Sequence, residues 1–454
     1  MAASGRHCGV IRVARIAAVV LGYGLLLCLL TVAANGYMAV KEQPLRLLWL
    51  IPGYLAANLL PGWWGNVLPS RRLRVCRHGA VLLCLFLAAA VLSVGWHGYL
   101  AFRLLPEAWQ DLLFSALLCT ALLAVTFWQG ILCVYATSGQ MRLKYRVIGL
   151  LCGMIPIAQL VALGVILRVV FTELRTEGEK EVVNRRRQAE QICATRYPVL
   201  LVHGVFFRDS RYFNYWGRIP EQLTRNGARV YYGEQSSAAS VAESGAYLAR
   251  RIRQIVTETG CEKVHIIAHS KGGLDCRWAI ANEGVASCVA SLTTVNTPHR
   301  GCLFADYLLE KIPEGVKNRV AAAYNGALAG FGEKADFLAA VSDLTATACR
   351  ELDALPTPEG VLCRSIGSTV KRAAAGQFPL NFSYHLVNHF DGPNDGLVAE
   401  TSFAWGEEYT RLEASGKRGI SHGDMIDLNR ENIPGFDVRE FYVSLVAELK
   451  AMGM

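Results

Sequence analysis

The chain has 454 residues, more than one ordinary domain contains, so two or more structural units are expected. Hydrophobic residues make up 52% of it and charged residues only 18%, which excludes a disordered chain and indicates a membrane protein. Residues 1–171 carry 14 Lys and Arg against 3 Asp and Glu, whereas the rest carries 32 against 34, so the net charge of +9 belongs to the apolar half. No basic face with aromatic or arginine-rich readout accompanies this charge, which argues against a nucleic-acid partner.

Five apolar stretches in residues 1–171 predict an all-α transmembrane domain of about five helices. A helix needs about 20 residues to cross the hydrocarbon core of a bilayer, and every stretch is long enough. They occupy residues 11–34, 47–68, 79–102, 112–136 and 147–171. The second is the weakest, because prolines, glycines and asparagines interrupt it, and a kinked span or a re-entrant segment is an alternative for it.

The basic residues between these stretches predict how the chain is oriented. Short cytoplasmic loops collect Lys and Arg, and such residues cluster before the first stretch, between the second and third, and between the fourth and fifth. We therefore expect five spans in the cell membrane, with the N-terminus inside and the C-terminal domain extracytoplasmic. Basic residues also follow the last stretch, but glutamates are interleaved with them. No Asp, Glu or Lys lies within the stretches, so we expect them to anchor the protein rather than to transport a solute.

The second half of the chain has the pattern of a soluble α/β domain. Residues 172–196 are highly charged and are predicted to form a helical linker, followed by a catalytic domain over residues 197–454. Short apolar runs predict buried strands at residues 198–202, 230–232, 264–268, 290–295 and 361–366. Helical spacing separates several of these runs, most clearly over residues 240–259. Strands that alternate with helices predict a mostly parallel sheet with helices on both faces.

Ser270 stands where a predicted strand gives way to a predicted helix. The sequence there reads Val264-His-Ile-Ile-Ala-His-Ser-Lys-Gly-Gly273, with Ala268 and Gly272 two positions on either side of the serine. Small residues at these positions let a serine occupy a sharp strand-to-helix turn, the nucleophile elbow. Ala268 departs from the first glycine of that pattern by a single methyl group. Ser270 is therefore the predicted nucleophile, with an ordinary serine in a turn as the alternative.

His203, Gly204 and Val205 follow the first predicted strand. Acyl transfer needs backbone N–H groups that stabilise the oxyanion of a tetrahedral intermediate, one directly after the nucleophile and one from an early loop. This requirement assigns the amides of Lys271 and Val205 as the predicted oxyanion hole. Considered alone, a His-Gly pair after a strand is as readily an ordinary turn.

An acid and a histidine are predicted to complete a triad with Ser270. In hydrolases with a nucleophile elbow the order along the chain is serine, acid, histidine. His422 lies in a glycine-flanked loop before a terminal helical stretch, and Asp395 lies in a loop of Pro, Gly and Asn. We expect Asp395 to orient the imidazole and His422 to deprotonate the serine.

Three other residues compete for roles at this site. Asp391 is the alternative acid, and His389 is the alternative base. His385 and His389 are four residues apart on a predicted helix and could bind a metal ion, but no Cys or Glu nearby completes such a site. We therefore predict neither a metal ion nor a cofactor.

Residues 197–449 resemble the bacterial triacylglycerol lipases of the α/β-hydrolase fold. Five ordered motifs carry the resemblance: Tyr197-Pro-Val-Leu-Leu-Val-His-Gly204, Ala268-His-Ser-Lys-Gly-Gly-Leu-Asp275, Thr297-Pro-His-Arg-Gly301, Asn394-Asp-Gly-Leu-Val398 and Ser421-His-Gly-Asp424. The resemblance implies a triad of Ser270, Asp395 and His422, with the two oxyanion amides already assigned. It also implies that residues 297–301 form a structural turn beside the site.

Two further positions, Lys271 and Asp424, bear on how closely the sequence follows the family pattern. Many such lipases have His or Met after the nucleophile, and Lys271 at this position is expected to place a charge near the pocket rim. Some relatives bind a structural calcium through an Asp two residues after the catalytic histidine, and Asp424 matches that position. Residues 373–388 hold no carboxylate that could be a second ligand, so calcium remains a weak expectation and Asp424 is equally well a helix cap.

Residues 302–355 form a predicted helical insertion that is rich in alanine. Lipases of the family that this chain resembles place mobile helices over the active site at this point. Such a lid would admit water-insoluble esters and exclude water when closed. Helices that simply complete the fold are the alternative.

The resulting expectation is a membrane-anchored serine hydrolase that cleaves carboxylic esters, chiefly lipid esters such as triacylglycerols, through an acyl-enzyme. Its expected partners are the bilayer and a lipid or ester substrate, and the sequence makes no prediction about protein partners. An acyltransferase, or a deacylase of lipids or lipoproteins, with the same triad is the first alternative. A catalytically inert membrane scaffold is the second.

Overall fold

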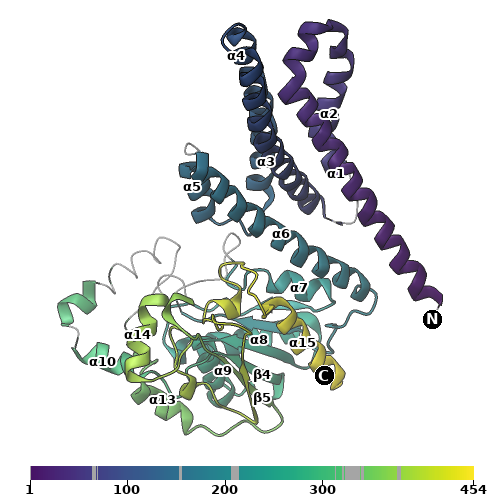
Figure 1. Ribbon diagram of the computed structural model, residues 1–454. Helices are drawn as coiled ribbons and strands as arrows, with labels where there is room; N and C mark the ends of the chain where they lie inside the picture. Colours follow the sequence, from purple (N-terminus) through teal and green to yellow (C-terminus); the bar gives the residue numbers. More distant parts are fainter. Residues whose placement is uncertain are drawn as a thin grey trace. The chain divides into compact units, whose positions relative to one another are not determined.

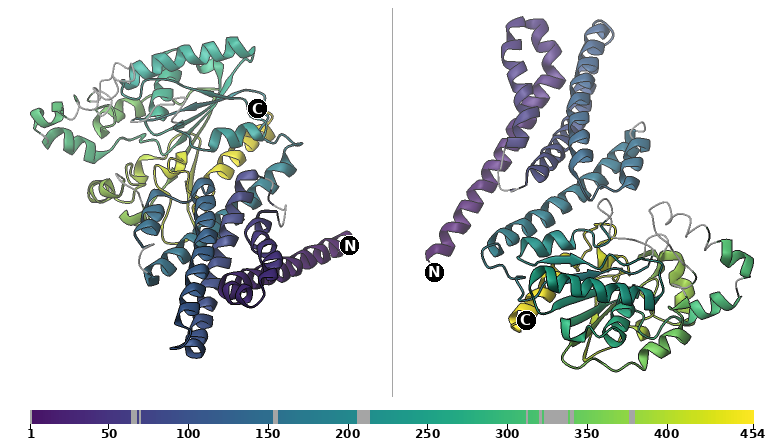
Figure 2. Two further views of the ribbon diagram at one scale, coloured as in Figure 1. Left: turned by 90° about the horizontal axis from the view of Figure 1, so that it is seen from above. Right: turned by 180° about the vertical axis from the view of Figure 1, so that it is seen from behind.

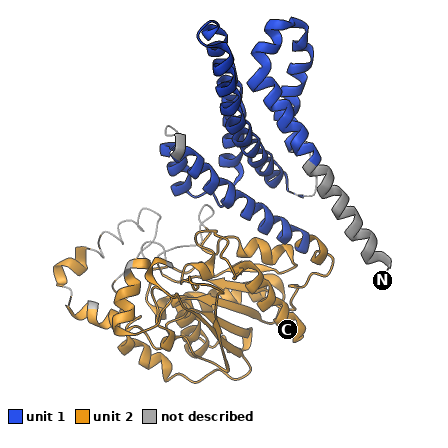
Figure 3. Cartoon of the chain, viewed as in Figure 1, with its two compact units in different colours: residues 1–183 blue, residues 184–454 orange. Residues whose placement is uncertain are grey.

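The computed structural model describes residues 2–63, 68, 70–152, 156–205, 214–311, 313–319, 322, 338, 342–375 and 380–454 (Figure 1). The chain divides into two compact units, residues 1–183 and residues 184–454 (Figure 3). Much of the segment predicted as a charged linker, residues 172–187, continues a helix that begins in the first unit.

The first unit is built of helices. They are α1 (Ala2–Glu42), the 3-10 helix η1 (Pro44–Arg46), α2 (Leu47–Trp63), α3 (Arg71–Leu104), α4 (Trp109–Thr137), α5 (Leu143–Cys152) and α6 (Pro156–Arg187), whose residues from 184 on belong to the second unit. Within the described part of the chain, three segments are long and apolar enough to cross a membrane: Val20–Glu42 of α1, and the whole of α3 and of α4. The prediction of about five spans is therefore wrong in number. Helix α2 has only 17 residues, two of them proline, and the stretch predicted over 147–171 is divided between α5 and α6.

Close helix contacts and one buried carboxylate hold the first unit together. A Cβ atom on Gly79 of α3 would lie 2.7 Å from the carbonyl oxygen of Gly130 on α4, so these helices approach closely at two glycines. Small residues serve this purpose in membranes, where van der Waals packing drives helix association. Glu173 of α6, whose side chain is 1% exposed, accepts hydrogen bonds from Arg72 of α3 (2.6 Å) and from Ser138 after α4 (2.5 Å).

The second unit is built on a six-stranded parallel sheet. Its strands are β1 (Val199–Val202), β2 (Val230–Tyr232), β3 (Val264–His269), β4 (Val289–Val295), β5 (Leu362–Ser368) and β6 (Glu408–Leu412), in the order β2-β1-β3-β4-β5-β6. The five predicted strands are present, with ends within two residues of those expected. The sequence does not predict β6, because this edge strand is largely exposed and lacks an apolar run.

Helices cover both faces of this sheet, as predicted (Figure 2). The unit contains α7 (Ile219–Arg225), α8 (Val241–Thr259), α9 (Lys271–Asn282), α10 (Leu303–Lys311), α13 (Ala346–Asp353), α14 (Leu380–Phe390) and α15 (Val438–Ala451), with the 3-10 helices η2 (Ala286–Cys288), η3 (Ala373–Ala375), η4 (Glu400–Ser402) and η5 (Asp424–Ile426). Val199 and Leu201 of β1 pack in one core cluster with α7 and α15, whereas Leu200 and Val202 pack in another with α8 and α9. This alternation follows from the pleat of a strand, and burial on both faces explains the uninterrupted apolar runs.

The insertion predicted over residues 302–355 is described only in part. Residues 312, 320, 321, 323–337 and 339–341 lie outside the described residues, and with them much of the predicted lid. The described parts include α10 and α13, which are helical as predicted.

Candidate active site

Ser270 lies at the carboxyl end of β3, in the interior of the sheet. Its backbone has φ 57° and ψ −133°, a conformation that residues other than glycine rarely adopt, and α9 begins with the next residue. Two backbone hydrogen bonds hold the turn, from the Ser270 N–H to the Val295 carbonyl (3.0 Å) and from the Gly273 N–H to the Ser270 carbonyl (3.0 Å). Such strain persists only where the surrounding structure imposes it, and it clusters at functional sites. The geometry is that of the predicted nucleophile elbow.

Two glycines let the neighbouring backbone approach Ser270. A Cβ atom on Gly204, in the turn after β1, would lie 2.7 Å from the Ser270 Cβ and 3.1 Å from its Oγ. A Cβ atom on Gly272, in the first turn of α9, would collide with the carbonyl oxygen of His203. The carboxyl ends of β1 and β3 are therefore in direct contact around the serine.

Replacement of Gly272 by alanine is expected to damage both stability and activity. The new methyl group would meet the carbonyl oxygen of His203, a backbone atom that cannot move without displacing the turn after β1. Overpacking of this kind costs about 1–3 kcal/mol in the free energy of unfolding. Thermal unfolding and the rate of ester hydrolysis measure the two effects. Gly315→Ala is the matched control, because a Cβ atom there meets nothing within 4 Å; a Gly272→Ala protein as stable and active as this control would contradict the close approach.

The two predicted oxyanion amides both lie near Ser270. Val205 belongs to the turn after β1 and follows Gly204, which contacts the serine. Lys271 is the first residue of α9, where N–H groups have no partner within the helix. The positive end of the helix dipole favours negative charge at this point. The arrangement can therefore support the stabilisation of an oxyanion beside the serine.

The side chain of Lys271 does not reach the pocket rim, contrary to the expectation. The residue is 1% exposed, and its Nζ donates hydrogen bonds to Asp275 Oδ1 (2.6 Å) and to Ser244 Oγ (3.3 Å) on α8. Burial raises the pKa of Asp275 to about 7, against the opposing effect of the Lys271 ammonium group. A buried charge needs a partner of opposite sign. The lysine side chain therefore pairs with a carboxylate one turn further along its own helix.

Asp395 and His422 form a buried hydrogen-bonded pair. His422 Nδ1 lies 2.6 Å from Asp395 Oδ2, and the His422 backbone N–H donates to the Asp395 carbonyl oxygen (2.9 Å). Asp395 is fully buried, and its Oδ1 accepts hydrogen bonds from the N–H groups of Leu397 (2.9 Å) and Val398 (2.8 Å). With Nδ1 assigned to the carboxylate, Nε2 is the nitrogen left for proton exchange.

Backbone contacts with the end of β5 bring the loops of this pair together. The Val370 N–H donates to the Asn394 carbonyl (2.9 Å), and the Ile420 N–H donates to the Thr369 carbonyl (2.9 Å). Both loops are therefore attached to the carboxyl edge of the sheet. Ligands of open α/β sheets bind at this edge.

The ring of His269 links Ser270 with the pair formed by Asp395 and His422. His269 directly precedes Ser270, and the centroid of its ring lies 4.4 Å from that of His422. Its Nδ1 lies 2.8 Å from the hydroxyl of Tyr215, which accepts a hydrogen bond from the Gly204 N–H (3.1 Å). Burial lowers the pKa of His269 well below its ordinary value, so this imidazole is neutral. The structure thus gathers the predicted nucleophile, base and oxyanion turn in one region.

Sequence reasoning missed two polar residues of this region, Asn296 and Tyr215. Asn296 follows β4, has φ 46°, and donates from Nδ2 to Asp395 Oδ2 (2.6 Å) and to Ser368 Oγ (2.8 Å). Its place at the carboxyl end of a predicted strand is a signal that could have identified it. Tyr215 carries no comparable signal, because it lies in a loop without a recognisable motif.

The alternative acid, Asp391, and the two histidines of the possible metal site, His385 and His389, have other surroundings. The two oxygens of Asp391 accept hydrogen bonds from the N–H groups of Leu303 (3.1 Å) and Phe304 (3.2 Å), so this carboxylate caps α10. His385 and His389 are exposed on α14. No group of three or more His, Cys, Asp or Glu side chains that could hold a metal ion occurs among the residues that the structure describes.

The donors around Asp424 do not fit the calcium ion that the resemblance allows. Its two oxygens accept hydrogen bonds from the Arg418 guanidinium, at 2.9 and 3.1 Å, and Oδ2 also accepts one from the Ser421 N–H (2.8 Å). A calcium ion takes typically about six to eight oxygen ligands. Here a cation of the chain itself neutralises the carboxylate.

Buried neutral histidines are expected to make the second unit less stable in acid. Burial lowers the pKa of His265 to about 4 and the pKa values of His269 and His299 well below their ordinary value. Because the unfolded chain takes up these protons near pH 6.5 and the folded chain does not, stability that is present above that pH is lost as the pH falls towards 4. For His265 alone the loss should reach about 2 kcal/mol at about pH 5.

Unfolding of the full chain in detergent, followed by tryptophan fluorescence at a series of pH values, measures this loss. The His265→Asn variant cannot titrate at this position, so its free energy of unfolding should fall less steeply between about pH 6.5 and 5. Identical slopes for the variant and the wild type would contradict the neutral buried state of His265.

Comparison with models of known protein families gives no match. A triacylglycerol lipase of Vibrio cholerae is 31% identical over 233 residues, which make up 46% of this chain and 74% of that protein. Triacylglycerol lipases of Pseudarthrobacter phenanthrenivorans and Burkholderia plantarii are each 39% identical over 144 residues, or 30% of this chain, which spans only 44% and 40% of their lengths. A solved lipase structure from Bacillus licheniformis, in its mature form, is 25% identical with a TM-score of 0.42, over 56% of this chain and 92% of that one.

Proposed function

We propose that this chain, which belongs to the triacylglycerol lipase family, is a membrane-anchored serine hydrolase of carboxylic esters. The observation that carries the proposal is the buried pair of Asp395 and His422 in the neighbourhood of Ser270, a serine on a strained strand-to-helix turn. Their order along the chain, serine, acid and histidine, is the order of hydrolases that use a nucleophile elbow.

In the proposed reaction, the Ser270 hydroxyl attacks the ester carbonyl while His422 accepts its proton at Nε2. Asp395 holds the imidazole through Nδ1, which keeps the ring oriented and stabilises its cationic form. The amides of Val205 and Lys271 donate hydrogen bonds to the oxyanion of the tetrahedral intermediate. His422 returns the proton to the departing alcohol, and the acyl group stays on the serine until water releases it as a carboxylic acid. These steps need no metal ion or cofactor.

Lipid esters are the proposed substrates. The relatives from Vibrio cholerae, Pseudarthrobacter phenanthrenivorans and Burkholderia plantarii are named triacylglycerol lipases. The three helices that are long and apolar enough to cross a membrane would tether the catalytic unit to a bilayer, which keeps a hydrolase close to acyl substrates. The predicted lid would serve the same substrates, because it would shield an apolar acyl chain from water.

The extracytoplasmic face is the proposed location of the catalytic unit. Among the described residues three segments qualify as crossings, and three crossings would put the two ends of the spanning region on opposite sides, while Arg6, Arg12 and Arg15 favour a cytoplasmic N-terminus. The arginines at residues 71–77 and the basic residues at 142–146 would then face outward, against the usual charge preference, and a fusion experiment decides the location. Alkaline phosphatase fused to the C-terminus should be active and green fluorescent protein fused there should be dark; the reverse would contradict the location.

The chemical proposal is tested with p-nitrophenyl esters of increasing acyl length and the full chain purified in detergent. We expect hydrolysis, and the optimum of acyl length separates a lipase from a short-chain esterase. Added alcohols distinguish the acceptor: transfer of the acyl group to alcohol in preference to water would contradict a hydrolase and favour an acyltransferase. A folded chain that turns over none of these esters would contradict the proposal altogether.

A further inference from the structure

The loop that carries His422 is held by two arginine–aspartate pairs. Arg218 donates to Asp427 through Nε (2.7 Å), Nη2 (2.8 Å) and its backbone N–H (2.9 Å). Arg418 donates to Asp424 through Nη1 (2.9 Å) and Nη2 (3.1 Å). Both pairs thus have the two-pronged geometry in which a planar guanidinium binds a carboxylate most strongly. The two aspartates lie two and five residues beyond the histidine.

Both carboxylates are buried, and the two guanidinium groups are largely covered. The side chains of Asp427 and Asp424 are 1% and 3% exposed, and those of Arg218 and Arg418 are 21% and 27% exposed. Exposed ion pairs contribute little, because water and salt screen them. Removal of one partner from a buried pair is costly, because it leaves a charge without compensation. Each pair is therefore able to restrain the loop.

The backbone of the loop is restrained at the same two points. The N–H of Ser421, directly before His422, donates to Asp424 Oδ2 (2.8 Å). Asp427 has φ 53°. Its backbone and side chain lie so close to Gly217 that a Cβ atom on Gly217 would collide with them. The main chain is therefore fixed at Ser421, directly before the histidine, and the loop is held at Asp424 and Asp427 beyond it.

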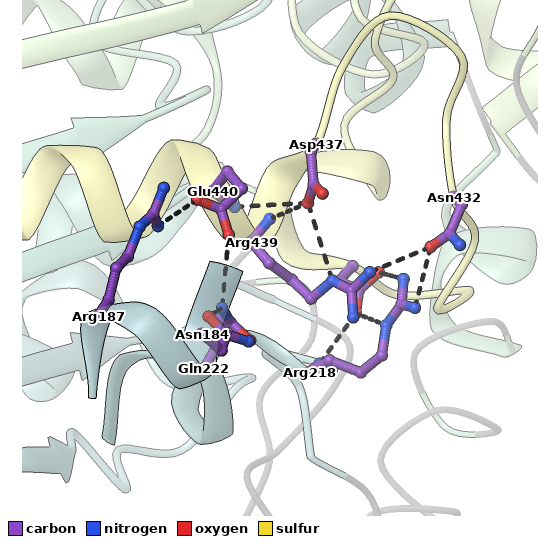
Figure 4. Close-up of polar contacts among 9 residues, drawn as sticks. Asn184, Arg187, Arg218, Gln222, Asn432, Asp437, Arg439 and Glu440 are labelled. Atoms are coloured by element: carbon purple, nitrogen blue, oxygen red, sulfur yellow. Dashed lines mark hydrogen bonds and ion pairs between the residues drawn. The ribbon is translucent and has the colours of Figure 1, made fainter. Parts of the chain in front are cut away.

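Arg218 is itself part of a wider polar network (Figure 4). Its Nη1 donates to Asn432 Oδ1 (3.1 Å), which also accepts a hydrogen bond from Nη2 of Arg439 on α15 (3.3 Å). The next residue of that helix, Glu440, accepts a hydrogen bond from Arg187 (2.6 Å) in the last turn of α6. Arg218 is thus linked through Asn432 to the first turn of α15, and Glu440 of that turn pairs with Arg187 in residues 184–187 of α6, which belong to the second unit.

We propose that Arg218 and Arg418 are positioning residues for His422, which hold its loop so that the imidazole meets Asp395. The inference rests on the proposed function. The arginines act through the two aspartates and not on the substrate. Asp424, whose position suggested a calcium ligand, has an arginine as its counter-ion, so the loop is stabilised by the chain's own cations.

The test uses the full chain in detergent and the variants Arg218→Gln, Arg218→Lys, Arg418→Gln and Arg418→Lys. Arg196→Gln is the matched control, because Arg196 forms an exposed pair with Glu262 (3.2 Å) in the same unit. Hydrolysis of p-nitrophenyl butyrate is divided by the number of active sites titrated with a fluorophosphonate, so that inactive protein does not contribute. Hydrogen exchange of residues 420–428 is measured in parallel, as a readout that does not depend on activity.

We expect the glutamine variants to lose about 10- to 100-fold in kcat per active site with KM unchanged. The lysine variants should recover part of this loss, because they restore the charge but not the two-pronged geometry. Exchange of residues 420–428 should accelerate in the glutamine variants. Neither the control variant nor treatment of the wild type with EDTA should change kcat or exchange.

Wild-type values of kcat per site in both glutamine variants would overturn the inference, whether or not exchange accelerates. Loss of wild-type activity in EDTA that calcium restores would overturn it as well. If the proposed function itself fails, the wild type will neither react with the fluorophosphonate nor hydrolyse the ester. In that case, unchanged hydrogen exchange of residues 420–428 in the glutamine variants would still overturn the restraint of the loop.

Discussion

A Ser270→Ala variant is expected to lose on the order of a million-fold in kcat for ester hydrolysis. Alanine keeps the Cβ atom and removes only the hydroxyl, so the proposed reaction loses its nucleophile. The residue is 3% exposed and its turn is held by backbone hydrogen bonds, so the fold should survive the change. Initial rates with p-nitrophenyl esters, at equal concentrations of folded protein, measure the effect.

Ser415→Ala, at an exposed position of the same unit, is the control for this variant and should retain wild-type turnover. Residual activity of Ser270→Ala within about tenfold of the wild type would contradict the triad, because the remaining groups of such a site provide only a small fraction of the rate.

An Asp395→Asn variant is expected to lose about 10⁴-fold in kcat. The carboxylate accepts hydrogen bonds from Asn296 Nδ2, His422 Nδ1 and the N–H groups of Leu397 and Val398. An amide has one acceptor oxygen in place of two, so its NH₂ group must face some of these donors. The imidazole then loses the contact that sets its tautomer and stabilises its cation. The kcat of ester hydrolysis per fluorophosphonate-reactive site measures the loss.

Asp391→Asn is the matched control for this variant, because Asp391 is the alternative acid in the sequence and its carboxylate caps α10. Loss of a cap costs about 0.5–2 kcal/mol in stability and should leave kcat within about tenfold. A larger loss of kcat in Asp391→Asn than in Asp395→Asn would reassign the acid.

Much of the sheet could be predicted from the sequence because its strands are buried on both faces. The residues of β1 pack alternately against helices on either side, so the strand is a continuous apolar run. The turn at Ser270 could be predicted for a similarly local reason: a sharp strand-to-helix turn needs small residues around it, and Gly272 has no room for a side chain.

The features that could not be predicted from the sequence depend on contacts with distant residues or on where elements end. The direction of the Lys271 side chain follows from a buried carboxylate on its own helix and from Ser244, 27 residues away on α8. Asn296 reaches Asp395 across 99 residues. The number of spans depends on where helices end, and an apolar stretch does not show that it is divided between two helices. The edge strand β6 is exposed, so it lacks the apolar run by which the other strands are recognised.

The measurement that tests the central claim most directly is the identification of the residue that carries the acyl group. The full chain is treated with a fluorophosphonate or a slowly hydrolysed ester and digested with trypsin, and the adduct is located by mass spectrometry. We expect a single adduct on Ser270, in the peptide of residues 264–271 that lies between two tryptic sites, and no adduct in Ser270→Ala. Ester hydrolysis with the adduct on another residue, or with an unmodified Ser270 throughout turnover, would contradict this expectation.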